Sequence, residues 1–273
     1  MRSRAFLVTL WLGTAGAAVV AAQFTPETAR AFDRYIQVTE ARQATEIDGR
    51  SPFLWLDRQP AGSKASYVAK LNNGGVVSAR LETRDNGRAM DDGDGKIHHW
   101  VGTVFFPKVT LQRAIAFVQA YEKYPEIFAP MIQRTKVINR APARFDVFMR
   151  TFSSNYGVTV VYDGDYGVDY RPLGPTRMFT KSVATNLHHV EDAGKPGERR
   201  VPAERAARGY LWRLNTYCSF EERAEGTYEQ CEAISLSEDP GWFLSLTLGW
   251  AFNGIPEDTL RETLGRVRAG LLK

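Results

Sequence analysis

The residues of this chain that could carry acid–base or metal chemistry are few. Its four histidines form two adjacent pairs, His98–His99 and His188–His189. Neighbouring side chains on a β-strand point to opposite faces, so each pair can turn only one imidazole toward a common site. A site made from one histidine of each pair and a carboxylate is the alternative to hydrogen-bonded or solvated strand histidines. Because no metal-ligand spacing accompanies these pairs, we predict no metal site.

Charged residues also occur inside apolar strand segments. Arg213 and Glu232 each lie between apolar neighbours in a predicted hairpin, and Arg150 lies in the segment Phe148–Phe152. A charge in such surroundings costs free energy unless it is paired or faces water. We therefore expect outward-facing charges or structural ion pairs, with a polar anchor at the floor of a cavity as the alternative.

Cys218 and Cys231 are the only cysteines, and they flank a predicted hairpin loop at Arg223–Gly226. A register that places them opposite each other allows a cross-strand disulfide, which would add about 2–3 kcal/mol of stability. A slip of one residue puts them on opposite faces and forbids the bond. Two buried free thiols are an equally good interpretation.

Motifs for nucleophilic catalysis and for cofactors are missing from the sequence. Ser153, Ser154 and Ser235 lack a Gly-x-Ser-x-Gly context. The glycine-rich segments lack the spacing of a phosphate loop or dinucleotide fingerprint. The acidic segment Asp85–Lys96 does not align with the glycine and glutamate positions of a calcium loop. We predict no cofactor.

The elements that must position these residues follow from the hydrophobic pattern and the helix caps. Thr25 and Pro26 begin a helix that extends to about Thr45, and Thr110 caps a second helix that Pro125 interrupts. A C-terminal helix is expected to begin at Pro256, with an apolar stripe from Leu260 to Leu271. The further expected elements are a loop or short strand at 51–60, a helix at 63–71, strands at 76–82, 97–106, 135–139, 143–152, 158–162, 166–170 and 178–191, and a hairpin of 209–222 with 227–236.

Sequential strands joined by short turns predict an antiparallel sheet, and one amphipathic helix must bury its stripe on one face of it. This pattern resembles the helix-grip superfamily of START-like and birch-pollen-allergen-like proteins, which includes polyketide cyclases and lipid carriers. Three segments carry the resemblance: 97–130 with its Tyr124-Pro125 break, the hairpin 209–240, and the final helix 255–272. The pattern also resembles exported bacterial members of this superfamily, whose role is uncharacterised.

The resemblance implies an α+β fold, in which a curved antiparallel sheet wraps around the long C-terminal helix and leaves a cavity between them. It covers residues 97–273, whereas 23–96 form an N-terminal helical and β extension without a counterpart. The superfamily has no shared catalytic motif, so the resemblance assigns no catalytic residue.

Our leading hypothesis is a non-catalytic carrier or sensor for an apolar small molecule, such as a lipid or a polyketide-like compound. The predicted ligand-binding residues are Trp212, Leu214, Tyr217, Phe220 and Trp250, with Arg150, Arg213 and Glu232 as polar candidates. One alternative is a cyclase- or hydrolase-type enzyme whose acid or base is Glu232, His188 or Tyr217. Another is an interaction protein with a closed cavity and an exposed aromatic patch at Phe53, Leu54 and Trp55.

The N-terminus indicates the compartment. Arg2 and Arg4 precede an apolar run that ends in Val20-Ala21-Ala22, which is typical of a secretory signal peptide at residues 1–22. A retained membrane anchor is the alternative. Removing residues 1–22 lowers the net charge of the 273-residue chain from +4 to +2, which excludes a strongly basic nucleic-acid binder. We expect an exported protein, periplasmic or secreted. The sequence does not specify its oligomeric state.

The apolar segment Gly241–Asn253 lies directly before the predicted C-terminal helix. It is expected to be a buried connection. The alternative is a lid over the cavity mouth, which would allow transient contact with a membrane surface.

Overall fold

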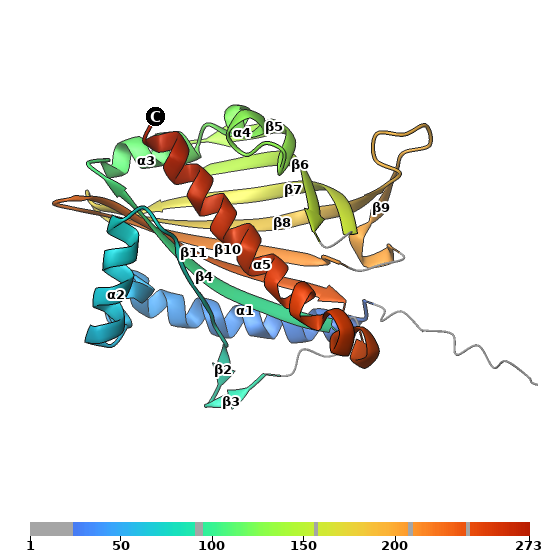
Figure 1. The fold of residues 1–273 in the computed structure, drawn as a ribbon, viewed down its shortest axis with the longest axis horizontal. Helices are drawn as coiled ribbons and strands as arrows, with labels where there is room; N and C mark the ends of the chain where they lie inside the picture. Colours follow the sequence, from blue (N-terminus) through green and yellow to red (C-terminus); the bar gives the residue numbers. More distant parts are fainter. Residues whose placement is uncertain (1–23, 91–94, 156–157, 207–209, 239–240) are drawn as a thin grey trace, which may run out of the picture.

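The computed structural model describes the backbone of residues 24–90, 95–155, 158–206, 210–238 and 241–273, and the side chains of these residues except 155, 158 and 241–255. Its main element is a nine-stranded antiparallel sheet (Figure 1). In spatial order the strands are β1 (Val77–Arg80), β4 (Gly95–Pro107), β11 (Gly226–Glu238), β10 (Arg213–Arg223), β8 (Arg177–Glu191), β7 (Val158–Pro172), β6 (Arg144–Asn155) and β5 (Ile132–Ala141), and β9 (Arg199–Pro202) pairs with β8.

The long helix α5 (Gly241–Leu271) crosses one face of this sheet diagonally, and we call that face the inner face (Figure 1). Its buried stripe contains Leu260, Leu264, Val267 and Leu271, as the sequence predicts. Gly102 on β4 allows the close approach, because a Cβ atom there would lie 2.6 Å from Leu264 Cδ1. The predicted α+β helix-grip architecture is confirmed.

Three short helical elements close one end of the inner face. These are α3 (Leu111–Val118), η2 (Tyr121–Lys123) and α4 (Tyr124–Ile127). The Thr110 hydroxyl accepts a hydrogen bond of 3.3 Å from the backbone N–H of Arg113, which is the predicted cap. A further short helix, η3 (Ala203–Arg205), follows β9.

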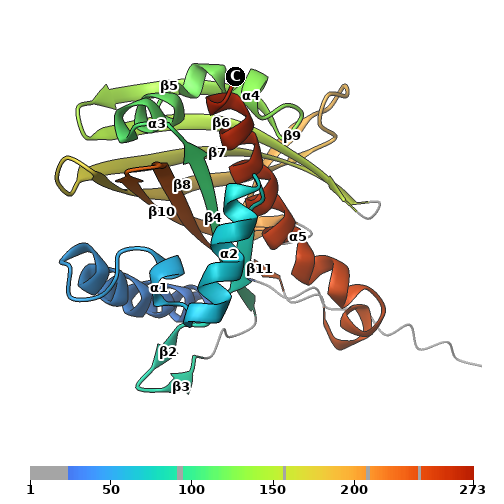
Figure 2. The ribbon, with the colours of Figure 1, turned by 60° about the vertical axis from the view of Figure 1, so that its left-hand side comes forward.

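The N-terminal extension covers the opposite face, which we call the outer face (Figure 2). It contains α1 (Pro26–Ile47), η1 (Trp55–Arg58) and α2 (Ala61–Asn72), followed by the hairpin of β2 (Arg84–Asp85) and β3 (Arg88–Ala89). Phe53, Leu54 and Trp55 are only 4%, 0% and 8% exposed and pack on the sheet. The alternative with an exposed aromatic patch at these residues is therefore wrong.

Three predicted boundaries need correction. The C-terminal helix begins at Gly241 and not at Pro256, which lies inside it. A proline fits the first turn of a helix and is disfavoured in the interior, where it removes one hydrogen bond and crowds the preceding turn, so its position predicts a start that the structure does not show. The expected strands 158–162 and 166–170 are one strand, β7, whose register shifts at Asp165/Tyr166. The segment 51–60 contains the 3₁₀ helix η1.

No helix in the described part of the chain is long and apolar enough to cross a membrane. The predicted signal peptide, residues 1–22, lies outside the described residues.

Candidate functional site

The two faces of the sheet are easiest to follow along β11. Cys231 packs in the core beneath α5, and its alternate neighbours Glu229 and Ala233 share that inner face. Glu232 faces the other way and bonds to side chains of α1. Two buried glutamates, three residues apart, therefore lie in different layers of the molecule.

The outer-face glutamate accepts three hydrogen bonds. Glu232 Oε2 accepts hydrogen bonds from Arg42 Nη2 at 2.6 Å, Gln43 Nε2 at 3.0 Å and His99 Nε2 at 3.3 Å. Burial alone would raise the pKa of Glu232, but the hydrogen bond from His99 and the charge of Arg42 outweigh it and lower the pKa to about 2. Glu232 is thus an ionised group in a structural ion pair.

The same network continues into the extension. The Tyr35 hydroxyl is hydrogen-bonded to His99 Nδ1 at 3.0 Å and accepts from the backbone N–H of Thr83 at 2.9 Å. Because the Glu232 carboxylate can only accept, the Nε2–H group of His99 is the donor to it. These hydrogen bonds hold α1 and the segment before β2 on the sheet.

Several predicted ligand-binding residues lie on this outer face. Trp212 packs with Phe24, ring centroids 5.5 Å apart, and the Tyr217 hydroxyl donates to Glu40 Oε1 at 2.6 Å. Trp212, Tyr217 and Glu232 are all about 2% exposed and face away from α5. Their predicted place in a cavity against α5 is corrected: alternation along β10 and β11 puts them under α1 instead.

The predicted arginines form ion pairs, as the first of the two interpretations expects. Arg213 pairs with Glu204 and lies 4.7 Å from the centre of the Phe24 ring, so it is not near Glu232. Arg150 binds both oxygens of Asp163, at 2.7 and 2.9 Å, and Glu198 at 2.8 Å. The hydrogen bonds that Arg150 donates to Asp163 and Glu198 raise the pKa of Arg150.

Leu214 and Phe220 do face α5. Phe220 is 1% exposed and belongs to the packed core, whereas Leu214 is half-buried. Trp250 lies in α5, but its side chain is outside the described residues.

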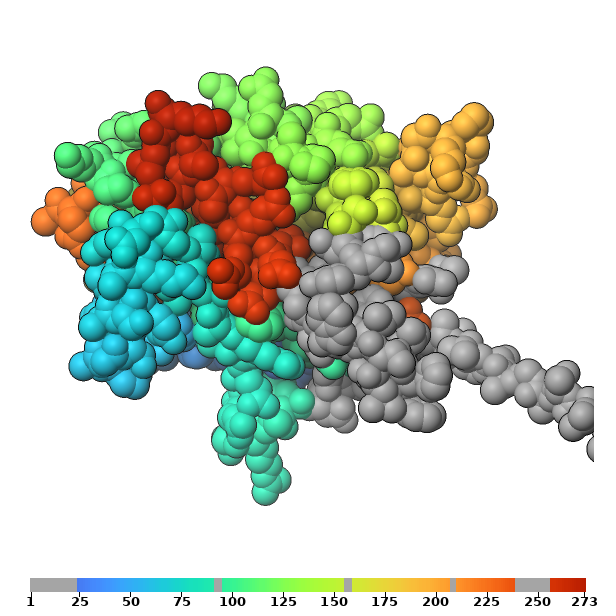
Figure 3. Space-filling view, viewed as in Figure 1, coloured from blue at the N-terminus to red at the C-terminus, as the bar shows by residue number. Residues whose placement is uncertain are grey.

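Leu214 belongs to a set of half-buried apolar residues that border the core on the inner face, and we call it the inner strip. Its members come from five strands: Trp100, Met149, Ala184, Leu214, Cys218 and Ala233. Ala233 faces Trp100 on β4 and Thr216 on β10, so the strip runs across the sheet. Figure 3 views this side, with the C-terminal half of α5 lying between α2 and the strands β5 to β7. The strip is apolar surface that the described core leaves partly uncovered.

Glu229 lies at the end of the inner face that α3 and α4 close. Its cross-strand neighbours are Phe220 and Val104, both buried, and it is itself 3% exposed. Its Oε2 has no hydrogen-bond partner among the described residues. Burial raises the pKa of Glu229 to about 8, so the carboxyl is neutral at pH 7.

Tyr124 and Tyr170 interact electrostatically with this carboxyl, but their hydroxyls, and that of the neighbouring Tyr121, bond elsewhere. Those of Tyr121 and Tyr170 are 2.7 Å apart, and that of Tyr124 donates to the Val118 carbonyl at 2.6 Å. Burial raises the pKa of all three, that of Tyr121 to about 12. Glu229 is the functional candidate that we did not predict. The sequence signal for its position is its spacing from Cys231. Two residues that are two apart on a strand lie on the same face, and Cys231 has to face Cys218.

The cysteines are joined. Cys218 and Cys231 face each other in the predicted register, with an S–S distance of 2.07 Å and Cα atoms 4.1 Å apart. Both sulfurs and a carboxylate oxygen of Glu229 lie within 4.8 Å of one another. Because disulfide sulfurs are not thiolates, this group is not a set of thiolate metal ligands in the oxidised protein.

The histidines do not converge. His98 bonds to Ser237 Oγ at 3.1 Å, and burial lowers its pKa to about 4, whereas His99 belongs to the outer network. In the described part of the chain the Nδ1 atoms of His188 and His189 are buried without a partner. Adjacent residues of β8 point to opposite faces, so these two cannot serve one site.

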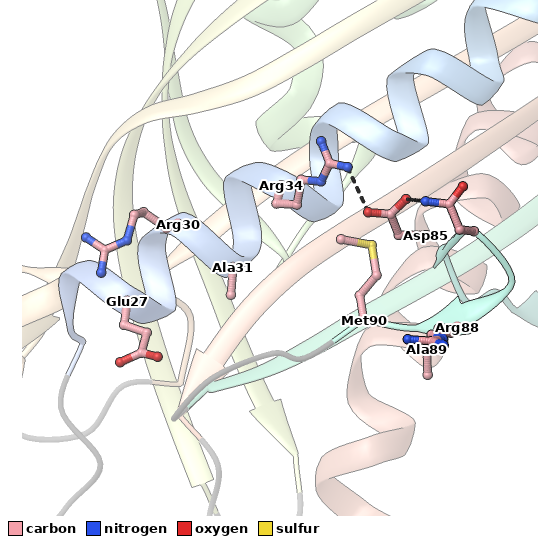
Figure 4. Close-up of a pocket in the computed structure, with 9 residues that line it drawn as sticks. Glu27, Arg30, Ala31, Arg34, Asp85, Arg88, Ala89 and Met90 are labelled. Atoms are coloured by element: carbon pink, nitrogen blue, oxygen red, sulfur yellow. Dashed lines mark hydrogen bonds and ion pairs between the residues drawn. The ribbon is translucent and has the colours of Figure 1, made fainter.

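An open surface groove of about 730 Å³ lies between α1 and the β2–β3 hairpin (Figure 4). Arg34 on α1 bonds to Asp85 across it at 2.7 Å. The groove is lined by Glu27, Arg30, Ala31, Arg34, Asp85, Asn86, Arg88, Ala89 and Met90. None of these residues is on the inner face, so the groove is separate from the strip.

No protein-family model and no curated protein sequence matches the chain. Among solved structures, it is similar to a fragment of a STAR-related lipid transfer protein from Xanthomonas axonopodis, at 14% identity over 68% of this chain and 97% of that one, with a TM-score of 0.42. It is also similar to the Zhui aromatase/cyclase from Streptomyces sp. R1128, at 10% identity over 64% and 94% of the two chains, with a TM-score of 0.43. For human STARD10 the identity is 8%, the coverage 77% and 80%, and the TM-score 0.42. At such distances only the residues of this chain can indicate what it does.

Proposed function

We propose that the protein binds an apolar small molecule between the inner face of the sheet and α5. The observation that carries this proposal is the inner strip, which presents half-buried Trp100, Leu214 and Met149 beside a packed core. Apolar surface that remains partly in water is where an apolar ligand gains most from burial. A lipid or a polyketide-like compound has this chemistry.

A role without catalysis fits the polar groups better than the enzyme alternative. The predicted acids and bases Glu232 and Tyr217 point into the outer layer, and the His188 ring does not approach them. A cavity enzyme needs titratable groups that converge on the substrate. On the inner face, a carboxylate oxygen of Glu229 lies within 4.8 Å of the strip residue Cys218, and burial raises the pKa of this carboxyl to about 8.

We also propose that the protein is exported. The N-terminal segment 1–22 has the composition of a signal peptide, and a disulfide is typical of oxidising compartments. Sequencing the N-terminus of the mature protein tests this: a chain that begins near Gln23 supports export, and one that retains Met1 contradicts it.

The ligand site is tested with the apolar fluorophore 1-anilinonaphthalene-8-sulfonate. Leu214→Glu places a charge in the strip and should weaken binding about tenfold or more, because burying that charge is costly. The matched control is Ile138→Glu on β5, where the side chain is 56% exposed, and its affinity should stay within about twofold of wild type. Circular dichroism checks that both variants fold. Equal affinities in the two folded variants would contradict the site.

A further inference from the structure

The carboxyl of Glu229 is in contact with the disulfide. Glu229 Oε1 lies 3.5 Å from Cys231 Sγ, and both groups are buried, at 3% and 5% exposure. A disulfide sulfur has no proton to give, so a hydrogen bond between the two groups would have to be donated by the protonated carboxyl. Tyr124 on α4 and Tyr170 on β7 interact electrostatically with Glu229, Tyr121 on η2 is hydrogen-bonded to Tyr170, and none of the three carries a positive charge.

The two cysteines differ in burial. Cys218 is half-buried and belongs to the inner strip, whereas Cys231 is 5% exposed, lies beside Glu229 and belongs to the same core cluster as Leu260 and Leu264. Attack on a disulfide takes place at the more accessible sulfur, and the other sulfur leaves. Here the leaving sulfur would be Cys231, and a thiolate in that apolar position is costly unless it gains a proton.

We propose that Cys218–Cys231 is a thiol–disulfide exchange site in which Glu229 gives its proton to the departing sulfur of Cys231. The co-reactant is a dithiol. Ligand binding in the strip is not required for this reaction.

The steps balance as follows in atoms and electrons. A thiolate of the dithiol attacks Cys218 Sγ and forms a new S–S bond, while the old bond breaks and its electron pair goes to Cys231 Sγ. That sulfur takes the Glu229 proton, leaving a thiol and a carboxylate. In the resulting mixed disulfide, the second thiolate of the dithiol attacks the dithiol sulfur that is bonded to Cys218, and Cys218 is released as a thiolate. The dithiol is oxidised to a disulfide, the protein gains two thiols, and the two protons that the dithiol lost to water return to Cys218 and Glu229.

The reaction is followed by trapping free thiols during reduction with dithiothreitol between pH 5.5 and 9.5. Each rate constant is divided by the fraction of dithiothreitol present as thiolate. In the wild type this corrected rate constant should fall about tenfold as the pH rises through 8, since an ionised Glu229 has no proton to donate. Rates proportional to the dithiothreitol concentration show that opening of the protein does not limit the rate.

Substitutions identify the donor. Glu229→Gln should lower the corrected rate constant at pH 6.5 by about tenfold or more and remove its pH dependence. Glu229→Asp keeps a carboxyl and should retain the pH dependence. The matched control is Glu225→Gln in the exposed hairpin loop, which should behave as wild type. A Glu229→Gln protein with the rate and pH profile of the wild type would overturn the proposal, as would a folded wild type that dithiothreitol does not reduce.

Discussion

Glu229 and Glu232 lie on the same strand, and both are almost completely buried, yet their surroundings shift the two pKa values in opposite directions. Glu232 has three donors and a pKa lowered to about 2, whereas Glu229 has an unpartnered oxygen and a pKa raised to about 8. Burial penalises both carboxylates, so the difference comes from the partners that each face supplies.

The comparison separates a structural layer from a reactive one. On the outer face, α1 provides Arg42 and Gln43, and β4 provides His99, which together fasten the N-terminal extension to the sheet. On the inner face, Glu229 meets tyrosines and a disulfide, and none of the described residues there offsets a negative charge. A buried polar group left without a partner lowers stability, and such groups are concentrated where function requires them.

The largest effect is expected from breaking the outer network. Arg42→Met leaves Glu232 buried without its cation and should lower the free energy of unfolding by about 3 kcal/mol at pH 7. Urea unfolding measures this. The control on the same helix is Arg34→Met, whose partner Asp85 is exposed, and it should cost less than about 0.5 kcal/mol. Equal costs for the two arginines would show that burial of the Glu232 pair does not matter.

A smaller loss is expected from Tyr35→Phe. The substitution keeps the ring but removes the hydroxyl between His99 Nδ1 and the Thr83 N–H, which leaves two buried polar groups unpaired. The cost should be about 2 kcal/mol in the same urea experiment. A loss below about 0.5 kcal/mol would mean that water replaces the hydroxyl.

The hairpin register, the disulfide alternative and the apolar stripe of α5 could be predicted, because each depends on local spacing. The faces of β10 and β11 could not. Both faces of this hairpin are buried, one under α5 and the other under α1, so Trp212 and Tyr217 have the same composition signal as Leu214 and Phe220. Only the position of α1, which the sequence does not specify, assigns them to the outer layer.

For the same reason we predicted a role for Glu232 and none for Glu229. Each lies in an apolar strand, and the sequence around them does not show that Arg42, 190 residues earlier, reaches only one of them.

Unfolding free energies of the wild type, Glu229→Gln and Glu232→Gln between pH 3 and 9 test the central claim most directly. Below its folded pKa near 8 the native protein keeps the Glu229 proton, whereas the unfolded chain releases it above about 4.5. Wild-type stability from this group therefore falls with rising pH, by about 1.4 kcal/mol per unit. Glu229→Gln should match the wild type near pH 4.5 and become more stable toward pH 8.

Glu232 has the opposite sign, because its lowered pKa stabilises the fold above about 4.5 and this contribution is lost as the pH falls toward 2. Glu232→Gln should be about 3 kcal/mol less stable at pH 7, with the deficit shrinking below pH 4.5. Opposite changes in stability at pH 7 are the predicted result. Changes of the same sign in the two variants would contradict the assignment of one carboxyl to structure and the other to a reactive site.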